Sequence, residues 1–354
     1  MDLSLQSVNA ELSWKAKETR TPLIGIFELT GRCNLSCRMC YVRRAPNDKS
    51  AIASELSTER WLDLGRQAAD EGLLYLLLTG GEPFIRPDFF EIYEGLRELG
   101  IQISINTNAT MITPEIAQRL AANPPVVVNV TLYGASAETY ERTCGDASGF
   151  ERTLRGISLL RDAGIPVDMR TTIIRQNLDD FEQIYQISKE RKLKLELVDF
   201  VLANRDKAES TPFEVRLSAE EQAECVLRLD RMLTIDGRKP KDKNQTVKDV
   251  YIGGFYCASG NFSFSVNYAG NLCACLLLDD PSVPLGADGS FAEQWRTLVK
   301  LCENTPTCKE CIECDICEHC VECVANRKSE TGVLDKAAPY LCKMAEYTAA
   351  HIND

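Results

Sequence analysis

"TGRCNLSCRMCYVRR", residues 30–44, places three cysteines within eight positions, directly after the apolar run at residues 24–29. The cysteines are Cys33, Cys37 and Cys40, spaced C-x3-C-x2-C. A mononuclear tetrahedral zinc site needs four ligands. Three thiolates on one loop can instead hold three irons of a [4Fe–4S] cube and leave the fourth iron open. A partial zinc site, or loop cysteines without a ligand, are the alternatives.

The segments around this loop alternate short apolar runs with amphipathic patterns. The expected strands are 24–29, 74–79, 101–106, 126–132, 167–173 and 193–199, and the expected helices are 57–72, 87–100, 113–123, 149–164 and 178–192. Such repeated units predict right-handed βα crossovers and a parallel sheet. An eight-stranded barrel typically needs about 250 residues. We therefore expect an α/β fold with a partial, TIM-like (βα)6 barrel, with an open sheet as the alternative.

Residues typical of helix ends support these expected helices. Ser57 and Thr113 suit the N-cap position, and Pro114 suits the first helical position. Glycines follow the last turns of three helices, as is typical of helix C-termini. They are Gly72, Gly100 and Gly164.

The composition narrows the class of protein. The chain has 354 residues, 40 Lys and Arg against 52 Asp and Glu, and a formal net charge of −12. This negative charge argues against nucleic acid as the main partner. We interpret it as favouring solubility rather than the binding of cationic partners. The sequence lacks both a long apolar membrane segment and an apolar signal-peptide region, so we expect a cytoplasmic protein.

Cysteine usage is the strongest compositional signal. The chain has sixteen cysteines and only two histidines, His319 and His351. In a reducing compartment, clustered cysteines bind metal or do redox chemistry more often than they form disulfides. Thiolates favour zinc or iron–sulfur clusters.

A second motif, "TGGEP" at residues 79–83, follows the second expected strand. Its glycines allow close approach of the backbone to a ligand, and Pro83 fixes the turn. Ligands of α/β folds gather beyond the carboxyl ends of the strands. The cysteine loop and this motif should therefore share one rim, although a lone GGEP is also an ordinary strand-to-helix turn.

Together, the two motifs resemble those of radical S-adenosylmethionine (SAM) enzymes. The resemblance implies that Cys33, Cys37 and Cys40 bind a [4Fe–4S] cluster whose open iron takes the amino and carboxylate groups of SAM. It also implies reductive cleavage of SAM to methionine and a 5′-deoxyadenosyl radical, which abstracts hydrogen from a substrate. The residues implied in SAM binding are Met39, near the adenine, and Gly80, Gly81 and Glu82, at the amino group.

Further SAM contacts are expected on later strands. The resemblance suggests Asn106 and Asn108 near the end of strand three, and Arg170 in strand five can meet a carboxylate with two hydrogen bonds. Each can equally be a rim residue with a structural hydrogen bond. After strand four many relatives carry Asp–Gly, whereas this chain has Tyr133–Gly134.

The chain changes character after residue 205. A helix is expected at 218–233, followed by a polar stretch at 236–249 and a β-hairpin that turns at "YAGN", residues 268–271. We expect an N-terminal extension at 1–21, the barrel core at 22–205, a helix and linker at 206–250, and a cysteine-rich domain at 251–354.

This last region resembles the SPASM extension of radical SAM enzymes, which binds two auxiliary [4Fe–4S] clusters. The resemblance implies that auxiliary cluster I uses Cys257, Cys275 and Cys323, and that auxiliary cluster II uses Cys311, Cys314, Cys320 and Cys342. The first would lack a fourth ligand unless Cys273 or another cysteine supplies it. Cys302, Cys308 and Cys317 are surplus, a shifted register starting at Cys308-x2-Cys311-x5-Cys317 competes, and a zinc-binding knot is the alternative.

Three other residues are expected to be incidental. Cys144, in an expected loop, and Cys225, in an expected helix, are interpreted as small packing residues. His319 is interpreted as a surface residue. No acid, base or relay residue stands out.

The predicted function is oxidative modification of a ribosomally made peptide, such as a thioether or carbon–carbon crosslink, by a radical SAM/SPASM oxidoreductase. The alternatives are a radical SAM enzyme for a small molecule, such as a tetrapyrrole or quinone cofactor precursor, and a non-enzymatic iron–sulfur or zinc module. An electron donor such as flavodoxin or ferredoxin is expected. About 20 residues precede strand one, so we expect the core or a helper protein to bind a leader peptide.

Overall fold

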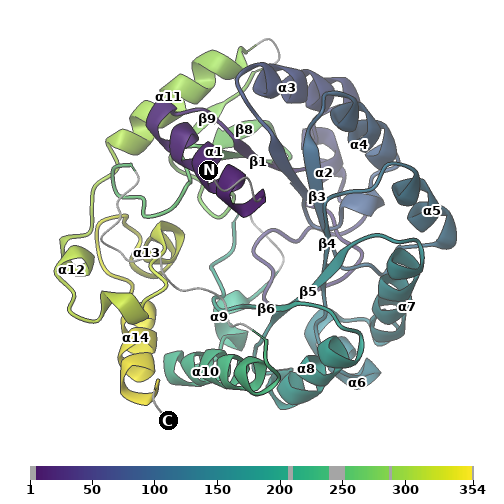
Figure 1. Ribbon diagram of the computed structural model, residues 1–354, viewed down its shortest axis with the longest axis vertical. Helices are drawn as coiled ribbons and strands as arrows, with labels where there is room; N and C mark the ends of the chain where they lie inside the picture. The colour runs from purple at the N-terminus through teal and green to yellow at the C-terminus, as the bar shows by residue number, and fades with distance from the viewer. Residues whose placement is uncertain (1–4, 206–209, 239–251, 287–288, 353–354) are drawn as a thin grey trace.

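The computed structural model describes residues 5–205, 210–238, 252–286 and 289–352, and a nine-stranded sheet is the framework of this part of the chain (Figure 1). The strand order is β6-β5-β4-β3-β2-β1-β7-β8-β9. Strands β1 to β6 are all parallel and in chain order. They are β1 (Ile24–Glu28), β2 (Tyr75–Thr79), β3 (Gln102–Thr107), β4 (Val128–Thr131), β5 (Val167–Thr172) and β6 (Leu195–Val198). The partial (βα)6 barrel predicted from the sequence is confirmed.

Helices between these strands lie mostly on the outer side of the sheet (Figure 1). They are α2 (Lys49–Ser54), α3 (Thr58–Asp70), α4 (Phe89–Glu98), α5 (Pro114–Ala122), α6 (Ala137–Cys144), α7 (Gly149–Asp162) and α8 (Phe181–Glu190). The predicted caps are confirmed, since Ser57 and Thr113 each accept a backbone hydrogen bond of 3.3 Å from the first turn of their helix. Helices α2 and α6 were not predicted.

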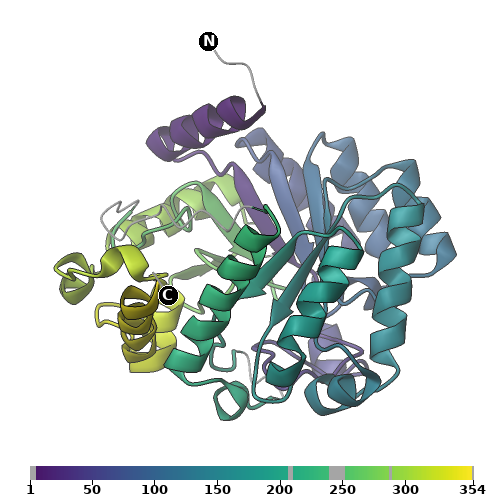
Figure 2. The same ribbon diagram turned by 60° about the horizontal axis from the view of Figure 1, so that its bottom comes forward.

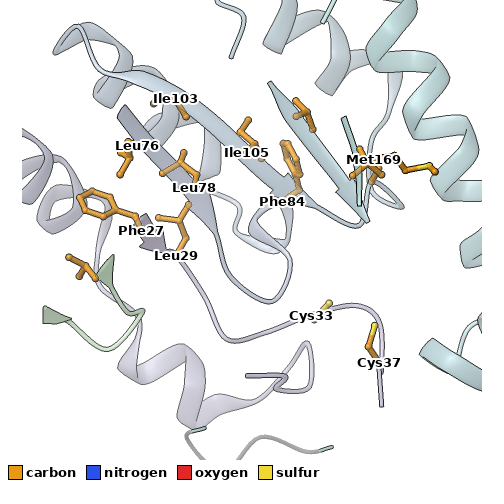
Figure 3. Close-up of a cluster of buried hydrophobic side chains, with 14 of the residues drawn as sticks. Phe27, Leu29, Cys33, Cys37, Leu76, Leu78, Phe84, Ile103, Ile105 and Met169 are labelled. Atoms are coloured by element: carbon orange, nitrogen blue, oxygen red, sulfur yellow. The ribbon is translucent and has the colours of Figure 1, made fainter. Parts of the chain in front are cut away.

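The packed core lies between strands and helices. Alternate residues of β1, β2 and β3 point to one side and are buried, as Figure 3 shows for Phe27, Leu76, Leu78, Ile103 and Ile105. This alternation is the period-two pattern of a strand that has one face in the core. In the same view, the chain leaves β1 at Leu29 and carries Cys33 and Cys37 out beyond the strand ends. The core therefore fixes where the cysteine loop begins.

The sheet continues into the C-terminal region. Strand β7 (Ser263–Val266) pairs with β1 in parallel, and β8 (Asn271–Cys273) and β9 (Ser282–Pro284) follow as antiparallel partners. The predicted hairpin is thus present as β7 and β8. The hairpin belongs to the region expected as a cysteine-rich domain at 251–354, and it extends the barrel sheet.

Helices of the C-terminal region lie beside the open side of the barrel (Figure 1). They are α9 (Pro212–Val215), α10 (Ala219–Ile235), α11 (Phe291–Glu303), α12 (Lys309–Ile312), α13 (Val324–Thr331) and α14 (Pro339–His351). Helix α10 is the helix predicted at 218–233, and it packs on α14 through Ala219, Ala223, Leu341 and Met344. Most of the predicted polar stretch, residues 239–249, lies outside the described residues.

Helix α1 (Leu5–Thr19) covers the opposite end of the barrel from the cysteine loop (Figure 2). Its Leu12 and Ala16 pack near the beginnings of β1 and β2, with Ile24 and Tyr75. Among the described helices, none is both long and apolar enough to cross a membrane.

Candidate functional site

The cysteine loop is held on both sides by backbone hydrogen bonds. On one side, the N–H of Cys33 donates to the carbonyl of Arg44 at 3.0 Å. On the other, the N–H groups of Ser36 and Arg38 donate to the carbonyls of Cys144 and Thr143 at 2.7 and 3.1 Å. The end of α6 therefore supports the middle of the loop. Cys144 ends this helix, which corrects the expectation that it lies in a loop.

A buried ion-pair network fixes the start of the loop. The guanidinium of Arg32 pairs with the carboxylate of Glu55 through bonds of 2.7 and 2.8 Å, in the two-pronged geometry that arginine favours. Arg86 reaches the same carboxylate at 3.5 Å and donates to the carbonyl of Leu29 at 3.0 Å. The loop thus leaves β1 in one fixed direction.

Without a metal, the surroundings of the loop favour the protonated form of its thiols. Burial raises the pKa of Cys33 and raises that of Cys40 to about 11, while a hydrogen bond with Cys144, followed by burial, raises that of Cys37. N–H groups nevertheless point at the sulfurs, with the amide of Leu35 lying 3.4 Å from Cys33 Sγ. Backbone amides reach Cys40 in the same way. Hydrogen bonds to sulfur and a nearby cation both favour the thiolate, so this donor set fits an iron–sulfur cluster.

The GGEP turn lies directly on the cysteine loop. The N–H groups of Gly81 and Glu82 donate to the carbonyls of Thr30 and Arg32 at 2.8 and 2.9 Å. A Cβ on Gly80 would lie 2.4 Å from the Thr30 oxygen, and one on Gly81 would lie 2.2 Å from the Arg32 oxygen. Side chains would therefore separate the two loops. In this structure the glycines serve the approach of one loop to the other.

Glu82 occupies a closed polar pocket. Its carboxyl group is fully buried, and it accepts hydrogen bonds from the backbone amides of Phe84 and Asn108 at 3.2 and 2.9 Å. The Oγ1 atom of Thr107 completes the pocket. Burial raises the pKa of Glu82 to about 7, against the opposing effect of these hydrogen bonds. At neutral pH the group is therefore close to its midpoint of ionisation, and a nearby cation would increase the ionised fraction.

Asn108 connects strand β3 to the first cysteine. Its Nδ2 atom lies 3.0 Å from Asn34 Oδ1 and 3.7 Å from Cys33 Sγ. Its Oδ1 atom accepts from the amide and hydroxyl of Thr110. In this structure Asn108 therefore orients the cysteine loop. Met39 precedes Cys40 in the loop and was predicted to bind SAM; its side chain is buried, with 8% exposed.

A polar row crosses the inner face of the sheet at β3 to β6. Asn129 Nδ2 donates to Asn106 Oδ1 at 2.9 Å, and Arg170 Nη1 reaches the same oxygen at 3.3 Å. Arg170 also pairs with Glu196 at 3.0 Å, and about a third of its side chain is exposed. Two of the predicted residues, Asn106 and Arg170, thus meet at one place. Asn129 and Glu196 were not predicted, although a polar side chain within strands β4 and β6 was a usable signal.

Tyr133 and Cys144 are further neighbours of the cysteine loop. The Cys37 thiol accepts a hydrogen bond from the Tyr133 hydroxyl and donates one to the Cys144 sulfur. Tyr133 stands where the resemblance led us to look for an acid, and here it contacts Cys37. Cys144 is fully buried, as expected for a packing residue, and Cys225 is 2% exposed in α10. Sequence alone offered no sign that α6 would bring Cys144 to Cys37.

The C-terminal cysteines fall into two groups. In the first, the charges of Cys257 and Cys275 both act on Cys323, whose pKa is raised to about 12 by burial above all. Cys257 and Cys273 act on Cys275 in the same way. Cys302 is buried beside Gly260, and Cys257 acts on it too. Amides of Leu277 and Asn326 point at Cys275 and Cys323, as amides do in the first loop.

The second group contains six cysteines around α12 and α14. Cys320 lies near Cys342, Cys314 and Cys317, and its pKa is raised to about 12, chiefly by burial. Cys308 contacts Cys311 and also acts on Cys342. Both registers considered from the sequence therefore bring their cysteines into this group. His319 is partly buried and pairs with Glu318.

Among the described residues, no three His, Cys, Asp or Glu side chains surround a point where one metal ion could bind. A mononuclear zinc site would need such an arrangement. In a [4Fe–4S] cube each thiolate binds a different iron, so the sulfurs lie farther apart.

Comparison with known proteins agrees with this geometry. Residues 27–187 match the family model described as the radical SAM superfamily. An AdoMet-dependent heme synthase of Methanosarcina barkeri is 37% identical over 172 residues, 49% of this chain and 48% of the relative. A PqqA peptide cyclase of Ruegeria pomeroyi is 30% identical over 248 residues, 68% of this chain and 65% of the relative. The chain thus spans about half the length of the first of these curated relatives.

The fold is also similar to a solved structure. Native anSMEcpe with bound AdoMet superposes with a TM-score of 0.70 at 18% identity, covering 94% of this chain and 98% of that one. At this identity the likeness concerns the fold. It extends across the barrel and the C-terminal cysteine region, because nearly all of both chains is covered.

Proposed function

Because residues 27–187 form a radical SAM domain, we propose that this chain is a radical SAM enzyme that oxidatively modifies a ribosomally made peptide. The observation that carries the proposal is the contact between the cysteine loop and the GGEP turn. Three thiols and the buried carboxyl group of Glu82 are held on one rim by backbone bonds of 2.8 and 2.9 Å between the two loops. A bound [4Fe–4S] cluster and SAM would supply one-electron reduction and a carbon radical at this rim.

Cys33, Cys37 and Cys40 would hold the first cluster. Glu82 supplies an anion for the SAM ammonium, with Gly80 and Gly81 placing its backbone against the loop, and Arg170 supplies a cation for the SAM carboxylate. Asn106 orients Arg170, Asn108 orients Cys33, and Met39 offers an apolar surface for the adenine. Each of these roles rests on side-chain chemistry and on the contacts described above.

Two auxiliary [4Fe–4S] clusters belong to the same proposal. Cys257, Cys275 and Cys323 would hold auxiliary cluster I, because Cys257 lies close enough to raise the pKa of Cys275 and of Cys323, and Cys275 that of Cys323. Cys273 and Cys302 are the neighbouring thiols that could complete it. Cys311, Cys314, Cys320 and Cys342 would hold auxiliary cluster II, with Cys308 and Cys317 in the competing register. Such clusters can accept an electron from the substrate, which suits a net oxidation.

A peptide substrate fits this electron balance. Forming a thioether from one C–H and one S–H bond, or a carbon–carbon crosslink from two C–H bonds, removes two electrons and two protons. One electron and one proton would leave as a hydrogen atom taken up by the SAM-derived radical, the other electron would pass to an auxiliary cluster, and the other proton would go to solvent. One relative is named as a peptide cyclase, which favours a peptide substrate. The second candidate, modification of a tetrapyrrole or similar small molecule, is favoured by the name of the heme synthase relative.

The partners follow from the same chemistry. An electron donor such as flavodoxin or ferredoxin must reduce the first cluster, and a separate helper protein could present a leader peptide. A reducing compartment such as the cytoplasm keeps sixteen cysteines available as free thiols.

Coexpression with the short peptide encoded nearest to this gene tests the substrate. A mass loss of two hydrogens from the peptide, dependent on Cys33, is expected, and fragmentation of the product locates the bond. An unmodified peptide together with turnover of a tetrapyrrole precursor would favour the second candidate.

A further inference from the structure

The segment that follows β6 touches the cysteine loop directly. The backbone N–H of Arg205 donates to the carbonyl of Tyr41 at 2.8 Å. The hydroxyl of Ser210 donates to the carbonyl of Cys40. Two consecutive carbonyls, one belonging to a proposed cluster ligand, are therefore held by residues from the far end of the barrel domain.

The side chain of Arg205 reaches two further segments. Its Nη2 atom pairs with Glu28 Oε1 at 2.5 Å, and its Nη1 atom donates to the carbonyl of Leu276. The Arg205 side chain is 6% exposed and that of Glu28 is 0% exposed. The guanidinium also lies 5.5 Å from the centre of the Tyr41 ring, within the range of a cation–π contact.

These contacts join three parts of the molecule. Glu28 ends strand β1, Tyr41 follows Cys40, and Leu276 follows Cys275. The ring of Tyr41 is buried, and the charges of Glu28, Cys40 and Cys275 all act on it to raise its pKa after burial itself. Arg205 therefore lies between the cysteine loop and the first group of C-terminal cysteines.

A purely stabilising role does not account for this arrangement. A buried ion pair gives little net stability compared with apolar residues of the same size. The planar fork of an arginine can serve several acceptors in fixed directions, which a lysine cannot. Here the acceptors are a carboxylate of the barrel and a carbonyl of the C-terminal region, while the backbone of the same residue holds the loop.

We propose that Arg205 is a positioning residue that holds the Cys275–Leu276 segment against the Cys40–Tyr41 segment and so sets the separation of the two cluster sites. The identity of these sites as clusters rests on the proposed function; the contact itself does not. Electron exchange between two centres depends steeply on their separation, so a loosened contact would disturb the use of the auxiliary site.

The variants must separate this role from folding. Arg205→Gln alone leaves the Glu28 carboxylate buried without its partner, whereas Glu28→Gln together with Arg205→Gln removes both charges. Arg60→Gln is the matched control. Arg60 also pairs with an acid, Asp63 at 2.7 Å, and donates to the carbonyls of Leu285 and Gly286 at 2.9 and 2.7 Å. It thus joins α3 to the C-terminal region without contacting a cysteine segment.

Hydrogen exchange on the full chain tests the contact and needs no iron. The double variant should raise exchange in peptides covering residues 40–44 and 275–279 together, by about tenfold, the effect of losing one charged hydrogen bond. Arg60→Gln should leave both peptides unchanged. Unchanged exchange in the double variant, or a rise in only one of the two peptides, would overturn the proposal.

Pulsed electron paramagnetic resonance on the reconstituted, reduced protein tests the consequence. The double variant should broaden or shift the dipolar coupling between the first cluster and auxiliary cluster I. In Arg205→Lys the coupling should lie between that of the double variant and that of the wild type. Iron per chain should stay at the wild-type value. An unaltered coupling would refute the positioning role. Iron content of the wild-type chain judges the proposed function separately, because it does not involve Arg205.

Discussion

The hydroxyl of Thr107 lies 2.8 Å and 2.9 Å from the two carboxyl oxygens of Glu82. Both side chains are buried, and the strand that carries Thr107 pairs with the one that precedes the GGEP turn. The pocket therefore fixes an acid on the rim beside the cysteine loop, where a cation would lower its pKa. Its titration is the first measurable consequence.

The raised pKa of Glu82 predicts a pH dependence with a definite sign. Between its unfolded value of 4.5 and its folded value of about 7, the folded state keeps a proton that the unfolded state releases. Stability should fall as pH rises through this window, by up to about 3 kcal/mol. Glu82→Gln should flatten this fall in thermal unfolding from pH 4.5 to 8, whereas Glu138→Gln, at an exposed site, should not. A slope that survives Glu82→Gln would contradict the assignment.

SAM binding should show the opposite trend with pH. The Glu82 carboxylate attracts the SAM ammonium only when it is ionised, so affinity should rise as pH passes through about 7. Loss of the charge in Glu82→Gln should weaken SAM binding by about tenfold or more. Calorimetric titration of the reconstituted protein measures both effects. Equal affinity in the two proteins would remove Glu82 from the SAM site.

Replacing any cysteine of the first loop should abolish SAM cleavage. Cys33→Ala, Cys37→Ala and Cys40→Ala each remove one proposed iron ligand, and formation of 5′-deoxyadenosine should fall to background. Cys225→Ala is the control, because this thiol is buried in α10 and belongs to none of the proposed ligand sets. Normal cleavage in all three loop variants would refute the cluster assignment.

The auxiliary ligands should separate SAM cleavage from product formation. Cys311→Ala should lower iron to about 8 per chain and block the product, since one cube of four irons is lost. Some cleavage of SAM should persist. Cys308→Ala and Cys317→Ala decide between the two registers, because only one register needs them. Full product without Cys311 and Cys314 would show that auxiliary cluster II is wrongly placed.

Arg170→Lys should raise the dissociation constant for SAM by about tenfold, because lysine keeps the charge and loses the two-pronged bond to a carboxylate. Glu196→Gln is the control. It releases Arg170 from its 3.0 Å ion pair and should not weaken SAM binding. Calorimetry on both variants measures the dissociation constants for SAM. Weaker SAM binding in Glu196→Gln, with unchanged binding in Arg170→Lys, would show that the polar row does not bind the SAM carboxylate through Arg170.

Much of this architecture could be predicted from sequence. Strands β1 to β6 were predictable because short runs of six or seven residues, rich in β-branched residues or leucine, alternate with helical patterns. Each strand is paired in parallel with its neighbours. The rim position of Cys33 and Glu82 followed from their places after β1 and β2. The polar row was predicted in part, because its members Asn106 and Arg170 lie in strands of the same sheet.

Other features depend on tertiary contacts that no local pattern records. Cys144 reaches Cys37 only because α6 ends against the cysteine loop. The pairing of β7 with β1 joins segments more than two hundred residues apart, so the sheet continues past the expected boundary. The glycines of GGEP were predicted to leave room for a ligand, and their immediate neighbours are the carbonyls of Thr30 and Arg32. These relations need the packed chain.

Anaerobic reconstitution with iron and sulfide, followed by reduction with dithionite in the presence of SAM, tests the central claim most directly. We predict about 12 irons per chain, three cubes of four, and stoichiometric formation of methionine and 5′-deoxyadenosine. Tight binding of zinc, few irons and intact SAM after reduction would contradict the claim that this chain is a radical SAM enzyme with auxiliary clusters.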